Sequence, residues 1–417
     1  MAEEKKNIPK LRFREFTGDN ANAWELRKLG RISDISTGKA FKSSEFDKSG
    51  EFLVVTNKEI SDSKFSNKVA GDRINISDDK ILNKYVLIGQ NILVTMDGVN
   101  IGKVGKYTNS KAVLAQRVGR VQSKQFDFVY AVLDNQKFVN KMNVLAVGNA
   151  IKHISLSQIS DYHFWLPICD VEQQKIGSFF KHLDELITLH QRMLDEYKTL
   201  KKTMLSKIFP KNGEKYPELR FFGFTDAWEL RKLGLLASFT KGNGYSKKDL
   251  VQDSNQTPII LYGSLYTNYK TNIEKVDTFA RVKDKTIYSS GNDVVVPASG
   301  ESAEDISRAS AILKKGIILG GDLNIIHPLP DLNAIFLAIT ISNGTQKREL
   351  SRRAQGKSVV HLRNQDLKQV NLLYPNLEEQ QKIGSFFKHL DELITLHQRE
   401  LELLKTLKKT MLQQMFV

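Results

Sequence analysis

The sequence predicts an α+β protein organised as a pseudo-two-fold tandem repeat. Two bodies of mixed α/β structure are expected, separated by a long antiparallel coiled coil of two helices. Two observations predict this class. A 21-residue segment occurs twice without a change, at 172–192 and 379–399. Each copy begins a run with heptad spacing, and each follows a body of short β-branched runs bounded by Gly, Asn or Asp.

The repeat extends over the whole chain, with identical ends and divergent interiors. The 21-residue copy reads EQQKIGSFFKHLDELITLHQR, and KTLKKTML follows it in both halves. AWELRKLG opens each half, at 23–30 and 227–234, after a PKLRF or PELRF segment. Between these ends only a sparse skeleton is shared. We infer a duplicated scaffold that carries two differentiated surfaces.

The repeated segments read as long helices. Ile176, Leu183 and His190 recur every seven residues, and other apolar residues widen the stripe. No proline interrupts either run, and Pro167 and Pro375 stand just before the expected starts. Because the stripe occurs twice, the two helices are expected to pack on each other. The predicted seam comprises Ile176, Phe179, Phe180, Leu183, Leu186 and Ile187 in the first helix, and Ile383, Phe386, Phe387, Leu390, Leu393 and Ile394 in the second.

These patterns divide the chain into four predicted segments. They are the first body with its opening segment (1–168), the first helix (169–210), the second body (211–376) and the second helix (377–417). The apolar stretches 128–133 and 334–341 suit either a helix or a strand. Strands are expected at 52–55, 85–88, 92–95, 118–121, 258–262, 294–297 and 316–319.

Composition excludes several classes of protein. Of 417 residues, 62 are Lys or Arg and 47 are Asp or Glu, a balance of +15. Most of this excess lies outside 172–210 and 379–417, so the bodies are the basic part and a polyanionic partner is favoured. The single cysteine, Cys169, excludes an intramolecular disulfide framework. The start lacks the apolar core of a secretory signal, and a soluble, cytoplasmic protein is expected.

Motifs for chemistry are missing from the sequence. The carboxylates of Asp62, Asp78 and Asp79 have no nuclease pattern, and no P-loop, HExxH or methyltransferase target-base motif occurs. We therefore expect no catalytic residue, metal site or cofactor in this chain. Two alternatives stay open: a stand-alone DNA methyltransferase or nuclease with degenerate motifs, and a coiled-coil scaffold without a nucleic-acid role.

Residues suited to nucleic acid gather in equivalent loops of both bodies. Lys and Arg neutralise phosphates, while Gln, Asn and Arg read base edges. The DNA-binding candidates in the first body are Thr37, Gly38, Lys39, Lys42, Thr95, Asp97, Asn100, Lys103, Gln116, Arg117, Lys152 and His153. Those in the second body are Lys241, Asn243, Tyr245, Lys247, Ser299, Glu301, Arg308, Arg353, Lys357 and His361.

The two divergent bodies, each followed by a helix that begins EQQKIGSFF, resemble the specificity subunit of a type I restriction–modification system. The AWELRKLG openings and the pairs Leu166-Pro167 and Tyr374-Pro375 before the helices also fit that family. The resemblance covers the whole chain, although the bodies match only in skeleton.

The resemblance implies a non-catalytic function. Each body would be a target-recognition domain for one half of a bipartite site in double-stranded DNA. The paired helices would set the spacer and, with the seam residues, dock two copies of a modification (methyltransferase) subunit. The modification subunits and the restriction subunits, an ATP-dependent translocase and endonuclease, would hold S-adenosylmethionine, ATP and Mg²⁺. Two identical partners need two equivalent surfaces, which accounts for the invariance of 172–192 and 379–399.

Overall fold

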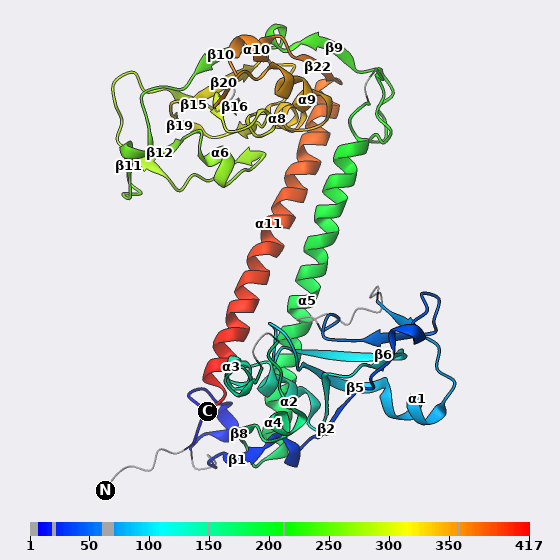
Figure 1. Cartoon of the computed structure of the whole chain (residues 1–417). Coiled ribbons are helices and arrows are strands. Elements are labelled where there is room, and N and C mark those ends of the chain that lie inside the picture. The colour runs from blue at the N-terminus through cyan, green and yellow to red at the C-terminus, as the bar shows by residue number, and fades with distance from the viewer. Residues whose placement is uncertain (1–6, 19–21, 61–70, 149–150, 212, 357–358) are drawn as a thin grey trace. The chain divides into compact units, whose positions relative to one another are not determined.

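The computed structural model describes every residue except 1–6, 19–21, 61–70, 149–150, 212 and 357–358. The chain forms two compact units. Unit 1 comprises Met1–Arg192 and His397–Val417, and unit 2 comprises Met193–Leu396. Two 38-residue helices, α5 (Asp170–Lys207) and α11 (Leu377–Gln414), each contribute residues to both units (Figure 1). None of the helices in the described ranges is long and apolar enough to cross a membrane.

Unit 1 is built on a six-stranded sheet in the order β2-β7-β5-β6-β3-β4, in which only β3 and β6 pair in parallel. A separate antiparallel pair joins β1 to β8. The expected strand at 52–55 is confirmed, whereas 86–88 and 92–95 belong to one irregular strand, β5, and Tyr85 ends the helix α1. The strands are β1 (Glu25–Lys28), β2 (Asp34–Thr37), β3 (Phe52–Val55), β4 (Arg73–Ile74), β5 (Val86–Thr95), β6 (Val104–Leu114), β7 (Val118–Gln122) and β8 (His163–Leu166).

The helices α2, α3 and α4 of unit 1 gather beside the start of α5 (Figure 1). The ambiguous stretch 128–133 lies in α2, where seven of the eight residues are buried. A helix that is buried on all sides has no polar face, which explains why periodicity alone could not assign it. The short helices are α1 (Asp79–Tyr85), α2 (Phe126–Leu133), α3 (Gln136–Leu145) and α4 (Leu156–Ser160).

Unit 2 contains two five-stranded sheets, ordered β10-β20-β16-β18-β13 and β11-β14-β12-β19-β15, and the small pairs β17-β21 and β22-β9. Both units therefore mix helix and sheet, as predicted. The strands are β9 (Glu229–Lys232), β10 (Ala237–Lys241), β11 (Leu250–Val251), β12 (Thr257–Ile260), β13 (Asn272–Ile273), β14 (Phe279–Ala280), β15 (Tyr288–Ser290), β16 (Asp293–Pro297), β17 (Ser299–Gly300), β18 (Ser310–Ile312), β19 (Lys315–Leu319), β20 (Leu323–Pro328), β21 (Val360–His361) and β22 (Asn371–Tyr374).

The helices of unit 2 enclose its main core. The stretch 334–341 is helical and lies in α8, which is buried in the same hydrophobic cluster as the start of α11. The short helices are α6 (Ser264–Thr267), α7 (Ala303–Ile306), α8 (Ala334–Ser342), α9 (Gly344–Arg353) and α10 (Asn364–Lys368).

Contacts inside unit 1 show that α5 and α11 run antiparallel. Asp184 of α5 binds Lys408 of α11 at 2.6 Å, and the Nδ1 atoms of His190 and His397 lie 3.1 Å apart. Residue numbers therefore rise along one helix as they fall along the other. Burial opposes the charged form of Lys408, but Asp134 and Asp184 outweigh it and raise the pKa of this lysine.

Unit 2 contains the matching contact. Lys201 of α5 forms an ion pair with Asp391 of α11, and these two residues are the repeat counterparts of Lys408 and Asp184. The predicted antiparallel pair of long helices is therefore confirmed in each unit.

The long helices bury only part of the predicted seam. The buried stripe follows the i, i+4, i+7, i+11 spacing that places residues on one helical face. Leu186 falls outside this face and is 43% exposed. Seam residues that are buried are Ile176, Phe180, Leu183, Ile187, Ile383, Phe387 and Leu390, and those that are partly buried are Phe179, Phe386, Leu393 and Ile394.

The repeated ends of each half meet at a buried ion pair. In unit 1, Arg12 of the PKLRF segment donates two hydrogen bonds to Glu172, at 2.6 and 2.7 Å, and the two side chains are only 5% and 1% exposed. In unit 2, Arg220 of PELRF binds Glu379 in the same way, and this hydrogen bonding raises the pKa of Arg220. The repeated opening segment is therefore held onto the start of the helix that follows in its own half.

The opening segment also caps the end of the other helix. The Leu11 N–H donates to the carbonyl of Gln414, the last residue of α11, at 3.0 Å. In unit 2 the Leu219 N–H donates to the carbonyl of Lys207, the last residue of α5, also at 3.0 Å. The final carbonyls of a helix have no partner within it, so this contact satisfies one of them in each unit.

Candidate nucleic-acid interface

Four segments that the sequence marked separately meet at one end of the unit 1 sheet. The first contact joins the residues after β2 to the turn between β6 and β7. The Lys39 N–H donates to the Leu114 carbonyl at 3.0 Å, and the Gln116 N–H donates to the Lys39 carbonyl at 2.9 Å. The Thr37 hydroxyl adds a bond to the Val118 carbonyl at 2.9 Å. Thr37, Lys39 and Gln116 are therefore neighbours, although they are far apart in the sequence.

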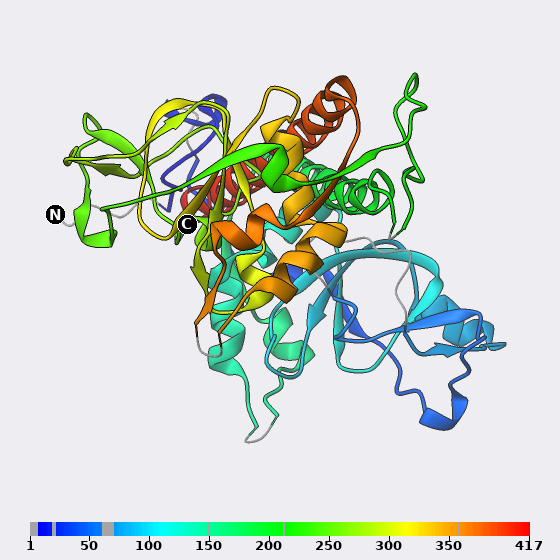
Figure 2. The same ribbon diagram turned by 90° about the horizontal axis from the view of Figure 1, so that it is seen from above.

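The second contact joins the β5–β6 loop to a hairpin formed around residues 147–153. Val147 and His153 exchange backbone hydrogen bonds at 3.0 and 2.8 Å, which closes the hairpin. The Gly98 N–H donates to the Lys152 carbonyl at 3.1 Å, and Asp97 forms a β-bridge with His153. Figure 2 shows the chain on either side of 149–150 extending away from α3 and α4. The exposed side chains of Lys152 and His153 therefore lie beside the β5–β6 loop.

Arg117 links these two contacts. Its side chain is 66% exposed and binds Asp97 at 3.0 Å. Its backbone has φ of 70°, a left-handed conformation that is uncommon outside glycine. Backbone strain of this kind persists only where the surroundings impose it, and it clusters at functional sites. The turn therefore holds an arginine in a constrained position between the four segments.

Unit 2 repeats the first contact with different side chains. The Asn243 N–H donates to the carbonyl of Leu319, the last residue of β19, at 3.4 Å, and the Gly242 N–H donates to the carbonyl of Leu323, the first residue of β20, at 2.9 Å. These bonds join the segment after β10 to the two ends of the β19–β20 turn. That turn carries Asp322, with φ of 57°, in the place that Arg117 occupies in unit 1. The two turns therefore share a backbone conformation and present opposite charges.

Unit 2 also repeats the hairpin. Gln355 and His361 exchange backbone hydrogen bonds at 3.0 and 2.7 Å, and His361 pairs with Ser299 across β17 and β21. The Leu362 N–H donates to the Ala298 carbonyl at 3.0 Å, just as residues 154 and 96 are joined at 2.9 Å in unit 1. Both units thus place the same four segments on one backbone plan.

A chain of polar side chains fixes the end of β10. The Thr240 hydroxyl lies 2.8 Å from Nε2 of His327, whose Nδ1 lies 2.7 Å from the fully buried Asp293. The Asn364 side chain donates to the Thr240 carbonyl at 2.8 Å. These bonds hold the backbone immediately before Lys241.

Two predicted DNA-binding residues are buried, and a third lies outside the described part of the chain. Thr95 and Tyr245 are 2% and 5% exposed, so they support the loops from inside. Lys357 lies outside the described residues. The candidates that lie in or beside the four segments, besides those already placed, are Gly38, Lys42, Asn100, Lys103, Asn243, Lys247 and Glu301.

The two predicted arginines of unit 2 are engaged within the fold. Arg308 binds the carboxylate of Asp305 at 2.6 Å, and two further donor atoms of its guanidinium reach backbone carbonyls. Arg353 binds Glu349 at 2.8 Å, one helical turn earlier in α9. A guanidinium whose donors are already bonded within the fold has fewer donors left for a phosphate. Arg308 and Arg353 are therefore weaker phosphate-binding candidates than the exposed lysines.

The sequence patterns did not identify the exposed apolar residues in the loops of unit 1. Val99 is 97% exposed in the β5–β6 loop, and Val147 and Ile151 are 54% and 64% exposed in the hairpin. Apolar side chains beside polar donors suit contact with thymine methyl groups. An apolar residue next to Gly or Asn in a predicted loop was the signal that could have identified Val99 and Val147.

Lys283 was also missed. Its ammonium group donates to the Gly244 carbonyl at 3.1 Å, and its hydrogen bond with Asp249 holds the pKa of that carboxyl down to about 2. The lysine therefore ties its own loop to the segment after β10. No repeated motif marked it, and its position became evident only from the fold.

Replacing Gly242 by alanine is expected to displace the end of β10. An added Cβ would overlap the Gly320 carbonyl oxygen, so the backbone must move, at a cost of about 1–3 kcal/mol. Gly263→Ala is the matched control, since its Cβ would meet nothing within 4 Å. Thermal unfolding of the two variants measures the difference, and equal melting temperatures would contradict the packing argument.

The clusters present groups of the kinds that nucleic-acid-binding surfaces use. Within the described ranges, no group of three or more His, Cys, Asp or Glu side chains could hold a metal ion. What the loops do present is cations, hydrogen-bond donors and exposed apolar groups, held on a constrained backbone. These are the groups that contact phosphates and base edges.

Comparisons with known proteins agree with this arrangement. The family described as Type I restriction modification DNA specificity domain matches residues 22–199 and 225–406. The type I restriction enzyme MjaVIII specificity subunit of Methanocaldococcus jannaschii is 21% identical over 342 residues, 79% of each chain. The putative type I restriction enzyme MjaX specificity subunit of the same organism is 22% identical over 97% of this chain and 95% of its own.

A solved structure shares the fold. The type I restriction–modification S subunit from M. genitalium superposes with a TM-score of 0.66 at 14% sequence identity, over 98% of this chain and 99% of that one. Since the family match covers most of both halves, the chain belongs to the type I restriction–modification DNA specificity domain family, carries two such domains in tandem, and is a specificity subunit, not a catalytic one.

Proposed function

We propose that each unit binds one half of a bipartite site in double-stranded DNA through its four-segment cluster. The observation that carries this proposal is one backbone plan with different side chains in the two units. Arg117 and Asp322 occupy equivalent left-handed turns and have opposite charges. A shared plan presents equivalent loops to equivalent grooves, and different side chains there read different bases.

The charges of the unit 1 cluster support binding to phosphates. Its exposed or half-exposed lysines are Lys39, Lys42, Lys103 and Lys152. Such cations bind the DNA backbone whatever its sequence, and the salt dependence of binding counts them. In this proposal Gln116, Asn100 and Arg117 contact the base edges. The exposed side chains of Val99, Val147 and Ile151 lie in the β5–β6 loop and in the hairpin.

The long helices supply the spacer and the docking surface in this proposal. Besides the buried stripe, they expose leucines within each unit, and leucine rows at helical spacing suit packing against partner helices. In unit 1 these are Leu186, Leu189, Leu403 and Leu407, between 39% and 54% exposed. In unit 2 they include Leu200 and Leu396, at 41% and 50% exposure.

The partners follow from the family and from these surfaces. Two copies of a modification subunit would dock on the helices, and restriction subunits would join the complex. S-adenosylmethionine, ATP and Mg²⁺ would reside in those subunits. This chain would contribute the choice of DNA sequence alone.

Exchanging residues 235–362 for those of a relative with another specificity tests the modular interpretation. The exchange replaces all four segments of unit 2 and keeps the Arg220–Glu379 ion pair. We expect one half of the methylated DNA sequence to change and the other half to remain. Sequencing of methylated bases in cells that carry the hybrid measures this, with the reciprocal exchange of 31–154 as a control. A change in both halves would contradict independent recognition.

Lengthening both helices tests the spacer. Four residues inserted after Gln191 in α5 and after Gln398 in α11 add the same helical length to each, about 6 Å. The same methylation assay should then show a changed number of bases between two unchanged half-sites. Altered half-sites with an unchanged spacer would refute the role of the helices as a ruler.

A further inference from the structure

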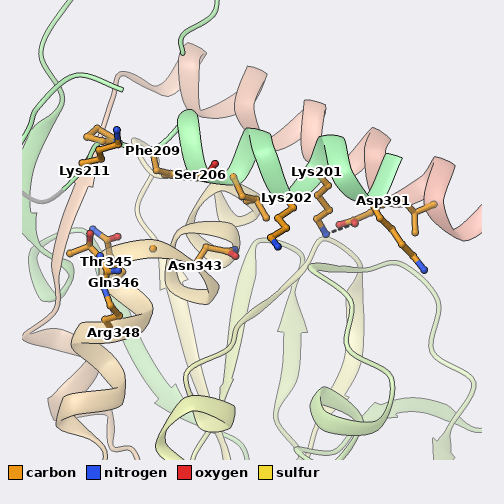
Figure 3. A pocket seen from close by; sticks show the side chains of 15 residues that line it. Lys201, Lys202, Ser206, Phe209, Lys211, Asn343, Thr345, Gln346, Arg348 and Asp391 are labelled. Atoms are coloured by element: carbon orange, nitrogen blue, oxygen red, sulfur yellow. Dashed lines mark hydrogen bonds and ion pairs between the residues drawn. The ribbon is translucent and has the colours of Figure 1, made fainter. Parts of the chain in front are cut away.

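Unit 2 contains a cavity of about 770 Å³ beside the C-terminal end of α5. The last turns of α5, the chain that follows them, the start of α9 and one turn of α11 line it (Figure 3). It opens to solvent, and its volume is that of a site for a small ligand or a few residues of a peptide. The hairpin of unit 2 follows the other end of α9, whose ten residues span about 15 Å.

The rim of the cavity is strongly cationic. Lys198, Lys202 and Arg348 are exposed on it, and no ion pair within the described residues engages them. Lys201 is paired with Asp391, the one acidic residue among the described lining residues, as Figure 3 shows. Three unpaired positive charges around one concave surface favour an anionic occupant.

The start of α9 adds to this potential. The helix begins at Gly344, and the side chain of its N-cap residue, Asn343, makes no capping hydrogen bond but donates to the Ile339 carbonyl at 2.8 Å. In unit 1, by contrast, the Asn135 side chain accepts a bond from the Lys137 N–H and caps α3. The N-terminal end of α9 therefore directs its positive dipole at the cavity without a capping oxygen from its N-cap residue.

The floor of the cavity is apolar. Leu205, Phe209 and Ile394 line it, and each is only partly covered by the unit. A free phosphate or the backbone of a duplex would leave this surface unused. An occupant that has both carboxylates and an apolar side chain would satisfy the rim and the floor together, and an acidic peptide segment has this chemistry.

The lysines of the cavity wall belong to the repeat, but their surroundings do not. Lys198, Lys201 and Lys202 recur as Lys405, Lys408 and Lys409 in the second copy of KTLKKTML. In unit 1, Lys408 is held between two carboxylates, those of Asp134 and Asp184. Asp134 immediately precedes Asn135, the N-cap residue of α3. In unit 2 the residue that precedes Asn343, the N-cap residue of α9, is Ser342. Unit 2 therefore has one carboxylate fewer beside the same three lysines than unit 1 has.

We propose that this cavity receives an acidic segment, with one aliphatic or aromatic side chain, from a protein partner. The proposal rests on the proposed function, in which the partner that contacts these helices is the modification subunit. The carboxylates of the segment pair with Lys198, Lys202 and Arg348, and its apolar side chain covers the three apolar residues of the floor. The contact strengthens docking on unit 2 and takes no part in reading DNA.

The test is a triple charge reversal, Lys198→Glu, Lys202→Glu and Arg348→Glu, in the full-length chain. The matched control reverses Lys275, Lys314 and Lys315, which are exposed in unit 2 away from the cavity and change the net charge equally. Titration calorimetry measures the affinity for the purified modification subunit without DNA. We expect the affinity of the cavity variant to fall at least tenfold and that of the control variant to stay within twofold of the wild-type value.

DNA binding by the assembled complex separates the possible outcomes. Unchanged partner affinity in the cavity variant overturns the proposal, and so does a fall in DNA affinity while partner affinity is kept, since that result makes the cavity a phosphate site. If the wild-type chain binds no modification subunit, the proposed function itself fails. If circular dichroism shows that the triple variant is unfolded, the milder pair Lys202→Gln and Arg348→Gln is judged by the same criteria.

Discussion

Replacing Arg12 with methionine is expected to lower the free energy of unfolding of unit 1 by about 3–5 kcal/mol. The substitution removes the partner of Glu172, whose side chain is 1% exposed and accepts two of the arginine's three hydrogen bonds, the third of which goes to the Asn22 carbonyl. Breaking a buried pair leaves one charge desolvated and uncompensated, and that cost exceeds the net value of the pair itself. Chemical denaturation followed by circular dichroism measures the change.

Two further variants separate this cause from a simple packing defect. Adding Glu172→Gln to Arg12→Met removes the stranded charge, so the double variant should recover a large part of the stability. Lys28→Met breaks the solvent-exposed pair with Asp161, whose side chains are 48% and 60% exposed, and should change stability far less. Equal effects of Arg12→Met and Lys28→Met would show that burial of Glu172 is not the cause.

Neutralising three lysines of the unit 1 cluster is expected to reduce DNA affinity on the order of a hundredfold at physiological salt. The variant carries Lys39→Gln, Lys42→Gln and Lys152→Gln, which lie in the segment after β2 and in the hairpin. Removing each phosphate-binding lysine should also reduce the slope of log affinity against log salt by about 0.9. Fluorescence anisotropy of the assembled complex on its target DNA, across a salt series, measures both quantities.

The control variant loses the same three positive charges at other positions of unit 1. Lys48, Lys124 and Lys141 are exposed in unit 1 outside the four segments, and the same change to glutamine there should leave the salt slope unaltered. If the affinity of both triple variants falls equally, general charge and not the cluster governs binding. If the affinity of neither variant falls, the cluster is not the DNA-binding surface.

The repeat and its periodicity predicted much of the fold. The long helices lie where the heptads and the flanking prolines placed them, and the strand at 52–55 has the expected bounds. Short-range patterns succeed there because local spacing alone decides which face can be buried. The stretches 128–133 and 334–341 stayed ambiguous, since a segment that is apolar on all sides carries no period.

Part of the arrangement of the candidate site follows from the sequence. Equivalent loops in both halves marked Lys39, Gln116 and Lys152, and the fold brings their segments together. The sequence could not show that Thr95 is buried or that Arg308 is engaged within the fold, because burial and pairing depend on the folded surroundings. For the same reason it overlooked Val99, whose 97% exposure is set by the fold alone.

The sequence by itself determined that this protein is a tandem of two α+β units with a repeated helix. Only the tertiary structure decided what the repeated residues do. Arg12 meets Glu172 across 160 residues, and Leu186 is 43% exposed while Leu183 and Ile187 beside it are buried. A repeat records that two surfaces are alike, whereas the partner of each side chain depends on which distant segments the fold brings within reach.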